Sequence, residues 1–157
     1  MRIKVLTFII LLFPVVFLES CEDEPCDKNL DSFVGIDFLT INEESATEDS
    51  SLSYLSLYAI SRPDSLLYDS TQNVTGILLP LSPKSDQSTF VFMIDSLNDT
   101  LEFRYNRDFK LVSQDCGFQS VFEIESVSST NHQIDFLSVI NTNVQSSDAT
   151  HLEIYLY

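Results

Sequence analysis

The chain has 157 residues, of which 24 are acidic and 8 basic, and its formal net charge is −16. Such an acidic surface repels phosphate backbones, so the composition excludes nucleic acid as a partner. Aliphatic and aromatic residues are too frequent for a disordered chain, because disorder requires low hydrophobicity as well as high charge. The length fits one domain with a two-layer core.

The first 20 residues read as a cleaved secretory leader. Arg2 and Lys4 give a positive start, and the apolar run over residues 5–18 is shorter than the roughly 20 residues that a membrane span needs. The run ends at Leu18-Glu19-Ser20-Cys21, which resembles a bacterial lipobox. The resemblance implies cleavage before Cys21 and a lipid on its sulfur, which would hold the mature protein on a membrane without spanning it. The alternative is a plain signal peptide followed by an ordinary cysteine.

Residues 21–33 are interpreted as an acidic tether ahead of a domain over residues 34–157. Glu22, Asp23 and Glu24 follow the cysteine directly. They fit a solvated linker, and they also resemble the acidic export signal that sends Bacteroidota lipoproteins to the outer face of the outer membrane. We therefore expect an outer-membrane location, with the periplasmic face and the cell surface both open. Without residues 1–20 the chain keeps six basic and 23 acidic residues, a net charge of −17.

Two cysteines, Cys26 and Cys116, remain once Cys21 carries lipid. Disulfides form and persist in the oxidising compartment that export implies, so we expect these two to pair. The link would close about 90 residues and stabilise the fold by up to roughly 4–5 kcal/mol. The alternative is two free, buried thiols.

Short strands dominate the rest of the chain. Segments rich in β-branched and aromatic residues alternate with Ser, Asn and Asp turns, and no apolar spacing of three to four residues lasts long enough for a helix. The expected strands cover residues 34–41, 54–60, 65–68, 74–81, 88–94, 100–105, 109–113, 118–127, 134–141 and 150–157. We count eight or nine firm strands, which predicts an all-β, antiparallel β-sandwich with Greek-key or jelly-roll wiring.

Three of the expected turns matter below. They cover residues 69–73, 95–99 and 106–108. On the last strand, Leu152 and Ile154 are expected to point inward, and His151, Tyr155 and Tyr157 outward.

Several short motifs together resemble a known family. They are Cys21 with its acidic neighbours, Cys26, Ser88-Thr89-Phe90-Val91-Phe92, residues 99–105, Cys116-Gly117-Phe118 and Thr150-His151-Leu152-Glu153-Ile154-Tyr155. The family is an uncharacterised group of Bacteroidota lipoproteins, domain of unknown function 6452. The resemblance implies an envelope lipoprotein and offers no activity.

The sequence contains no recognisable catalytic or metal-binding pattern. His132 and His151 are the only imidazoles, and each is expected at the surface, without a nucleophile beside it. Zinc spacing and a phosphate-binding glycine loop are absent from the sequence, and the acids lack the spacing of an EF-hand. We therefore expect no enzyme activity, no cofactor and no metal, and the alternative for the many carboxylates is a calcium site or an acid pair for glycoside chemistry.

Four hydroxyls follow an Asp in patterns that resemble Bacteroidota O-glycosylation acceptors. They are Ser65, Ser70, Ser96 and Thr100. Each is expected in or beside a turn, where a glycan could be accommodated.

The leading hypothesis is an envelope lipoprotein that binds or stabilises a partner at the outer membrane, such as an outer-membrane protein, without catalysis. The alternative is a carbohydrate-binding module or weak glycosidase. Tyr155 and Tyr157 would then offer an aromatic platform to a sugar.

Overall fold

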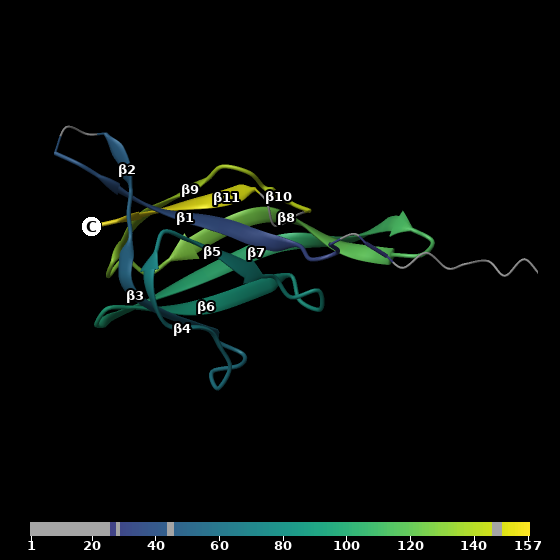
Figure 1. The fold of residues 1–157 in the computed structure, drawn as a ribbon, viewed down its shortest axis with the longest axis horizontal. Coiled ribbons are helices and arrows are strands. Elements are labelled where there is room, and N and C mark those ends of the chain that lie inside the picture. The colour runs from purple at the N-terminus through teal and green to yellow at the C-terminus, as the bar shows by residue number, and fades with distance from the viewer. Residues whose placement is uncertain (1–25, 28, 44–45, 146–148) are drawn as a thin grey trace, which may run out of the picture.

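The computed structural model describes residues 26–27, 29–43, 46–145 and 149–157, which form eleven strands and no helix (Figure 1). The strands are β1 (Phe33–Ile41), β2 (Thr47–Asp49), β3 (Leu52–Ala59), β4 (Leu66–Val74), β5 (Gly76–Pro80), β6 (Gln87–Ile94), β7 (Leu97–Ser113), β8 (Gly117–Ser129), β9 (Ile134–Val139), β10 (Asn143–Val144) and β11 (Thr150–Leu156). The predicted all-β class is confirmed, with more strands than expected.

The strands form two sheets. One has the order β2-β1-β11-β9, with β5 also paired to β1, and the other has the order β10-β8-β7-β6-β3-β4. Neighbouring strands are antiparallel except for β1 and β11, which run parallel. That parallel pair joins the first strand of the domain to the last.

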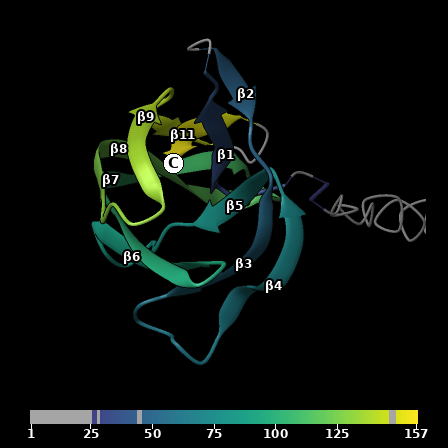
Figure 2. The same cartoon turned by 90° about the vertical axis from the view of Figure 1, so that its left-hand side faces the viewer.

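The sheets face each other across one apolar core (Figure 2). One sheet contributes Ile36 and Phe38 from β1 and Ile154 from β11, and the other contributes Phe92 from β6 and Phe103 from β7. These side chains alternate with more exposed neighbours, as expected for strands with one buried face. The sandwich prediction is confirmed.

The core contains one buried tyrosine that ties a loop to the second sheet. The Tyr105 hydroxyl accepts a bond from the Ser82 amide at 3.0 Å and lies 2.7 Å from the Ser88 hydroxyl. Burial raises the pKa of this phenol, so it stays protonated and can donate as well as accept. The hydroxyl thereby provides, from inside the sandwich, a hydrogen-bond acceptor for the backbone of the loop that follows β5.

The turn predicted at residues 106–108 is wrong. Strand β7 runs unbroken for 17 residues and pairs with β8 as far as Ser113↔Gly117. Beyond the last pairing of β8 with β10, the two strands form a protruding hairpin, residues 108–121, which we call the arm (Figure 1). Asn106, Arg107 and Asp108 are exposed strand residues at the base of the arm, where polar side chains are compatible with a strand as well as with a turn.

The turn predicted at residues 69–73 is also wrong, and the one at 95–99 is shorter than expected. Residues 69–73 belong to β4, an edge strand in which Ser70 and Asn73 have φ angles of 47° and 54°. Asn tolerates this region better than most residues, and such irregularities discourage pairing with another sheet edge. Only Asp95 and Ser96 form the turn between β6 and β7.

The expected leader, Cys21 and its acidic neighbours up to residue 25, together with residue 28, lie outside the described residues. Among the residues that are described, no helix is long and apolar enough to cross a membrane.

Candidate functional site

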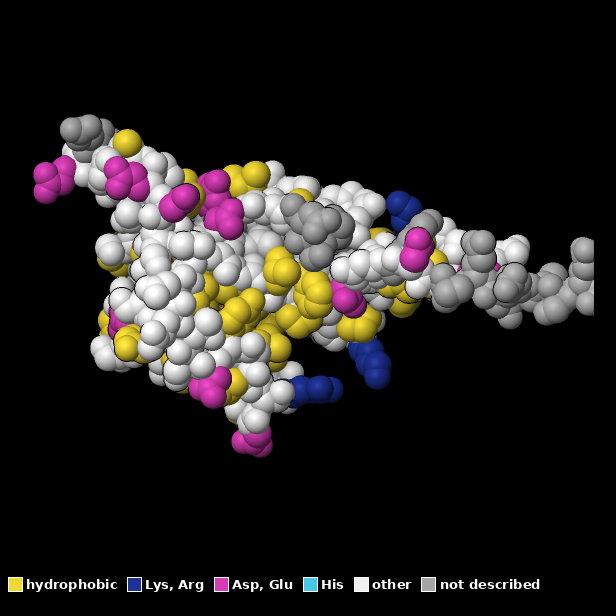
Figure 3. Space-filling view, in the orientation of Figure 1, with side chains coloured by type: hydrophobic (Ala, Val, Ile, Leu, Met, Phe, Trp, Pro, Cys, Tyr) yellow, Lys and Arg dark blue, Asp and Glu magenta, His cyan; other side chains and the backbone are white. Residues whose placement is uncertain are grey.

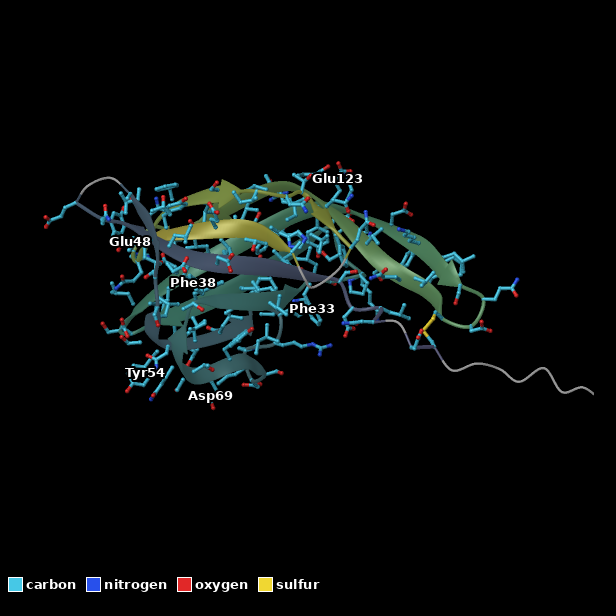
Figure 4. All side chains as sticks on the ribbon, turned by 45° about the horizontal axis from the view of Figure 1, so that its top comes forward. Phe33, Phe38, Glu48, Tyr54, Asp69 and Glu123 are labelled. Atoms are coloured by element: carbon cyan, nitrogen blue, oxygen red, sulfur yellow. A yellow bond between two sulfur atoms is a disulfide. The ribbon has the colours of Figure 1, made fainter. Side chains whose placement is uncertain are left out.

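The most distinctive feature is the tip of the arm, where the predicted disulfide is found. Cys26 and Cys116 are bonded, with their Cα atoms 4.9 Å apart and 90 residues between them in sequence. Figure 4 shows the sulfur–sulfur bond at the end of the molecule away from Glu48. The start of the described chain is therefore fixed to the arm tip, and not to the body.

Further contacts hold the chain after Cys26 against the arm. The Ser32 hydroxyl donates to the Ser120 carbonyl at 2.6 Å, and the Gln119 amide donates to the Ser32 hydroxyl at 3.2 Å. Gln119 also donates to the Gln145 carbonyl at 2.7 Å, and Lys110 reaches the Gln145 side chain at 3.4 Å. Since Lys110 and Gln119 are paired in the ladder, both act from one face of the arm.

The opposite face carries three exposed apolar side chains, which we call the arm patch: Phe109, Leu111 and Phe118. They are 59%, 56% and 65% exposed. Leu111 pairs with Phe118 in the ladder, and Phe109 lies two residues before Leu111, so all three share one face. This is the face that, nearer the body, carries the buried Tyr105 and Phe122. The arm patch therefore continues the core-facing side of the sheet beyond the opposing sheet.

A second site is internal, where β1 meets β11. Gly35 pairs with Thr150 and Ile36 with Leu152, so His151 is an extra residue, a bulge in a parallel pair. The Gly35 amide donates to His151 Nδ1 at 3.0 Å, and Nε2 lies 3.2 Å from the Asn143 carbonyl. A Cβ on Gly35 would lie only 2.3 Å from the Ala149 carbonyl oxygen, so this close approach requires glycine.

The outward orientation predicted for His151 is wrong. The residue is 1% exposed. Burial lowers the pKa of the imidazole, against the opposing effect of the Asn143 and Ala149 carbonyls. The neutral ring then accepts at Nδ1 and donates from Nε2, so it acts as a connector between strands. The alternation of apolar and polar residues could not reveal this orientation, because the extra residue of a bulge changes which face of the sheet the side chains point to.

Asp99 is a second buried polar residue that sequence reasoning did not single out. Its carboxylate accepts bonds from the amides of His132, Gln133 and Ile134 and from the Thr130 hydroxyl, at 2.7–3.1 Å. Burial alone would raise its pKa, but these bonds together hold the pKa below its usual value. His132 lies at the surface, as expected, with Nδ1 3.1 Å from the same carboxylate. Asp99 thus organises the loop before β9.

The expected aromatic platform is only partly assembled. Tyr155 is half-buried and stacks on Phe136 of β9, with ring centroids 4.0 Å apart and planes 11° from parallel. Tyr157 is 73% exposed and contributes to no stacked pair among the described residues. Phe136, which the sequence did not suggest, is 42% exposed and forms the open side of the pair.

One shallow cleft of about 260 Å³ lies between β1, β4, β5 and the start of β11. Its lining includes Asp37, Tyr68, Leu78 and Thr150. Its polar groups already bond one another: Thr150 donates to Asp37 at 2.7 Å, and Tyr68 accepts from the Leu78 amide at 3.0 Å.

Two of the four candidate glycosylation sites lie in or beside turns, as expected, and the other two lie within strands. Ser65 and Ser96 are exposed in the bend before β4 and in the β6–β7 turn. Ser70 is exposed but lies within β4, and Thr100 is half-buried within β7. Among the described residues there is no group of three or more His, Cys, Asp or Glu side chains suited to hold a metal ion.

Comparison with known protein families matches residues 54–156 with a family of unknown function, DUF6452. This match runs from Tyr54 in β3 to the end of β11 and includes the arm, His151 and Asp99. No curated protein and no solved structure matches the chain.

Proposed function

The chain belongs to the DUF6452 family, and on that premise we propose that it is an envelope lipoprotein anchored through Cys21. In this proposal the sandwich serves at the outer membrane as a non-catalytic binding or structural module. Its partner would be a protein of that membrane.

The disulfide between Cys26 and Cys116 is the observation that carries the proposal. Disulfides of this kind persist in exported proteins, which agrees with the leader expected over residues 1–20. The bond also gives the short segment after Cys21 a mechanical role. A lipid on Cys21 would be connected through five residues to a covalent link into the fold.

The positions of the two histidines support a non-catalytic role. Both ring nitrogens of His151 face backbone groups inside the fold. The Asp99 carboxylate beside His132 is occupied by three backbone amides and a hydroxyl. Each imidazole therefore has a structural use that accounts for its position.

A Cys21→Ser variant tests the anchor. In cells that process lipoproteins, the wild-type chain should fractionate with the outer membrane, and the variant should be released into the soluble envelope fraction. A Cys26→Ser/Cys116→Ser variant is the control, because it should remain in the membrane. Equal distribution of the wild-type and Cys21→Ser chains would refute the anchor.

Two further experiments address the partner and the membrane face. Crosslinking in living cells, followed by mass spectrometry, should capture an outer-membrane protein. A chain that stays monomeric and uncrosslinked would count against a partner. Protease added to intact cells should digest the domain if it lies on the cell surface and spare it if it lies in the periplasm.

A carbohydrate-binding role is the second candidate, favoured by the stacked pair of Phe136 and Tyr155 on the outer side of β9 and β11. A partly exposed aromatic ring on a sheet surface suits the apolar face of a sugar. A glycan array would test this role, with Phe136→Ala expected to abolish any signal. No binding by the wild-type chain would eliminate the role.

A further inference from the structure

We propose that the arm is a second membrane contact, in which the apolar side chains of Phe109, Leu111 and Phe118 insert into the surface of the bilayer that holds the lipid anchor. The inference rests on the proposed anchoring through Cys21 and adds a specific lipid-binding surface to it.

Covalent geometry places the arm close to any lipid on Cys21. Five residue steps separate Cys21 from Cys26, and a fully extended chain gains at most about 3.6 Å per step, or about 18 Å in all. The disulfide then carries the connection directly to Cys116. Phe118 is two residues further along, roughly 7 Å in an extended strand. The tip of the arm therefore cannot move far from the headgroups.

The arm projects from the correct end of the molecule for this contact. In Figure 1 the hairpin of β7 and β8 leaves the body on the side where the described chain begins, and the C-terminus lies at the opposite end. The space-filling view shows hydrophobic side chains continuing from the middle of the body towards the base of the arm (Figure 3). An anchor at this end would bring the arm to the membrane before any other part of the domain.

The charge of the arm distinguishes it from the rest of the chain. Residues 108–121 contain one basic residue, Lys110, and two acidic ones, Asp108 and Asp115. The arm therefore carries a net charge of only −1, whereas the mature chain carries −17. An apolar surface with so little net charge meets much less repulsion at an anionic bilayer than the acidic body would.

The two faces of the arm also differ in how they are occupied. Lys110 and Gln119 bond Gln145 and Ser32 on one face. Nothing among the described residues covers the other face, where the arm patch keeps more than half of each side chain exposed. Exposed Phe and Leu side chains on one side of a rigid ribbon match the interfacial region of a lipid layer.

Tryptophan fluorescence tests the contact directly, because the chain contains no tryptophan. A Phe118→Trp variant of the full, processed chain is reconstituted into phosphatidylcholine vesicles, with or without bromine on the acyl chains. We expect its emission to shift to the blue and to be quenched by brominated lipid. Tyr157→Trp is the matched control, since residue 157 is similarly exposed at the other end, and its emission should remain solvent-like.

A second set of variants, without tryptophan, tests whether the indole introduced at residue 118 itself causes the membrane binding. On the unlipidated Cys21→Ser chain, replacing all three arm-patch residues by serine should lower partitioning into the same vesicles at least about tenfold, since burying one such side chain favours the bound state by that factor. Leu66→Ser/Leu67→Ser on β4 removes exposed apolar surface away from the arm and should leave partitioning unchanged.

The results of these experiments distinguish a failure of the arm contact from a failure of the lipid anchor at Cys21. Detergent-phase extraction reports lipidation independently of the fluorescence, and a chain without lipid overturns both proposals. An anchored chain with solvent-like emission at residue 118 overturns the arm contact alone. Blue-shifted emission that brominated lipid does not quench means that a protein, either a second copy or another partner, covers the patch, and this also overturns it.

Discussion

Replacing His151 by leucine should destabilise the fold through a single lost hydrogen bond. Leucine can occupy the space of the ring but cannot accept from the buried Gly35 amide, which now bonds Nδ1 at 3.0 Å. An orphaned buried donor costs about 1–3 kcal/mol. The Asn143 carbonyl adds little, because Asn143 is exposed and water can replace the ring. We expect a loss of about 2 kcal/mol from a total of roughly 5–15 kcal/mol.

Urea unfolding followed by circular dichroism measures this loss. The midpoint should fall while the slope of the transition stays the same, because the surface exposed on unfolding does not change. His132→Leu is the control and should lose no more than about 1 kcal/mol, since that ring is largely exposed and Asp99 keeps its bonds from the Thr130 hydroxyl and three backbone amides. A His151→Leu chain as stable as the His132→Leu chain would refute the connector role of His151.

Comparison of the wild-type chain with His151→Leu also predicts how the free energy of unfolding depends on pH. Burial lowers the pKa of His151 in the folded state below that of an unfolded histidine, about 6.5. Below about pH 6.5 the unfolded chain therefore binds a proton that the folded chain does not, and stability falls as the pH drops towards the folded-state pKa. The stability difference between wild type and His151→Leu should shrink over this range. A constant difference would contradict a neutral His151.

Three further substitutions test other parts of the fold, each by urea unfolding. Replacing both cysteines of the disulfide by serine should cost up to about 4–5 kcal/mol, as expected for a closed loop of 90 residues; an unchanged midpoint would contradict this. Tyr105→Phe should cost about 1 kcal/mol, because the Ser82 amide and carbonyl both lose the phenol as a partner, while the Ser88 hydroxyl still accepts from the amide at 3.1 Å; a neutral effect would show that Ser88 and water replace the phenol. Gly35→Ala should cost about 1–3 kcal/mol, because its Cβ would collide with the Ala149 carbonyl; a stability equal to wild type would show that the β1–β11 contact can widen.

Period-two alternation predicted the strands that pack in the core. The expected strand over residues 88–94 matches β6, and the one over 150–157 matches β11 to within one residue. These strands have one face in the core, so burial imposes the pattern on their sequence. The fold class could be predicted for the same reason.

The arm and the edge strand β4 could not be predicted in this way. Residues 106–108 and 69–73 are exposed strand residues with the composition of turns, and local composition does not separate the two states. Whether such residues form a strand or a turn depends on hydrogen bonding to another segment of the chain, and the local sequence does not contain this information. The arm patch was therefore assigned to two separate short strands, and its common face was not apparent.

The connector role of His151 was missed although the sequence contains one signal for it. A glycine inside a predicted strand, Gly35, indicates a bulge or a close backbone approach. It does not name the partner strand, because the parallel pairing of β1 with β11 joins residues more than 110 positions apart. Pairing of the cysteines, by contrast, followed from their number and compartment alone.

The central claim is that lipid anchor, disulfide and arm form one unit, and a single peptide can test it. Trypsin should release residues 21–28 and 111–157, because Lys28 and Lys110 precede the cleaved bonds and no basic residue follows Lys110. Under non-reducing conditions the account predicts one species containing both peptides and the mass of a diacylglyceryl group on Cys21, which reduction splits into a lipidated short peptide and an unmodified long one. An unmodified Cys21, or free thiols at residues 26 and 116, would contradict it.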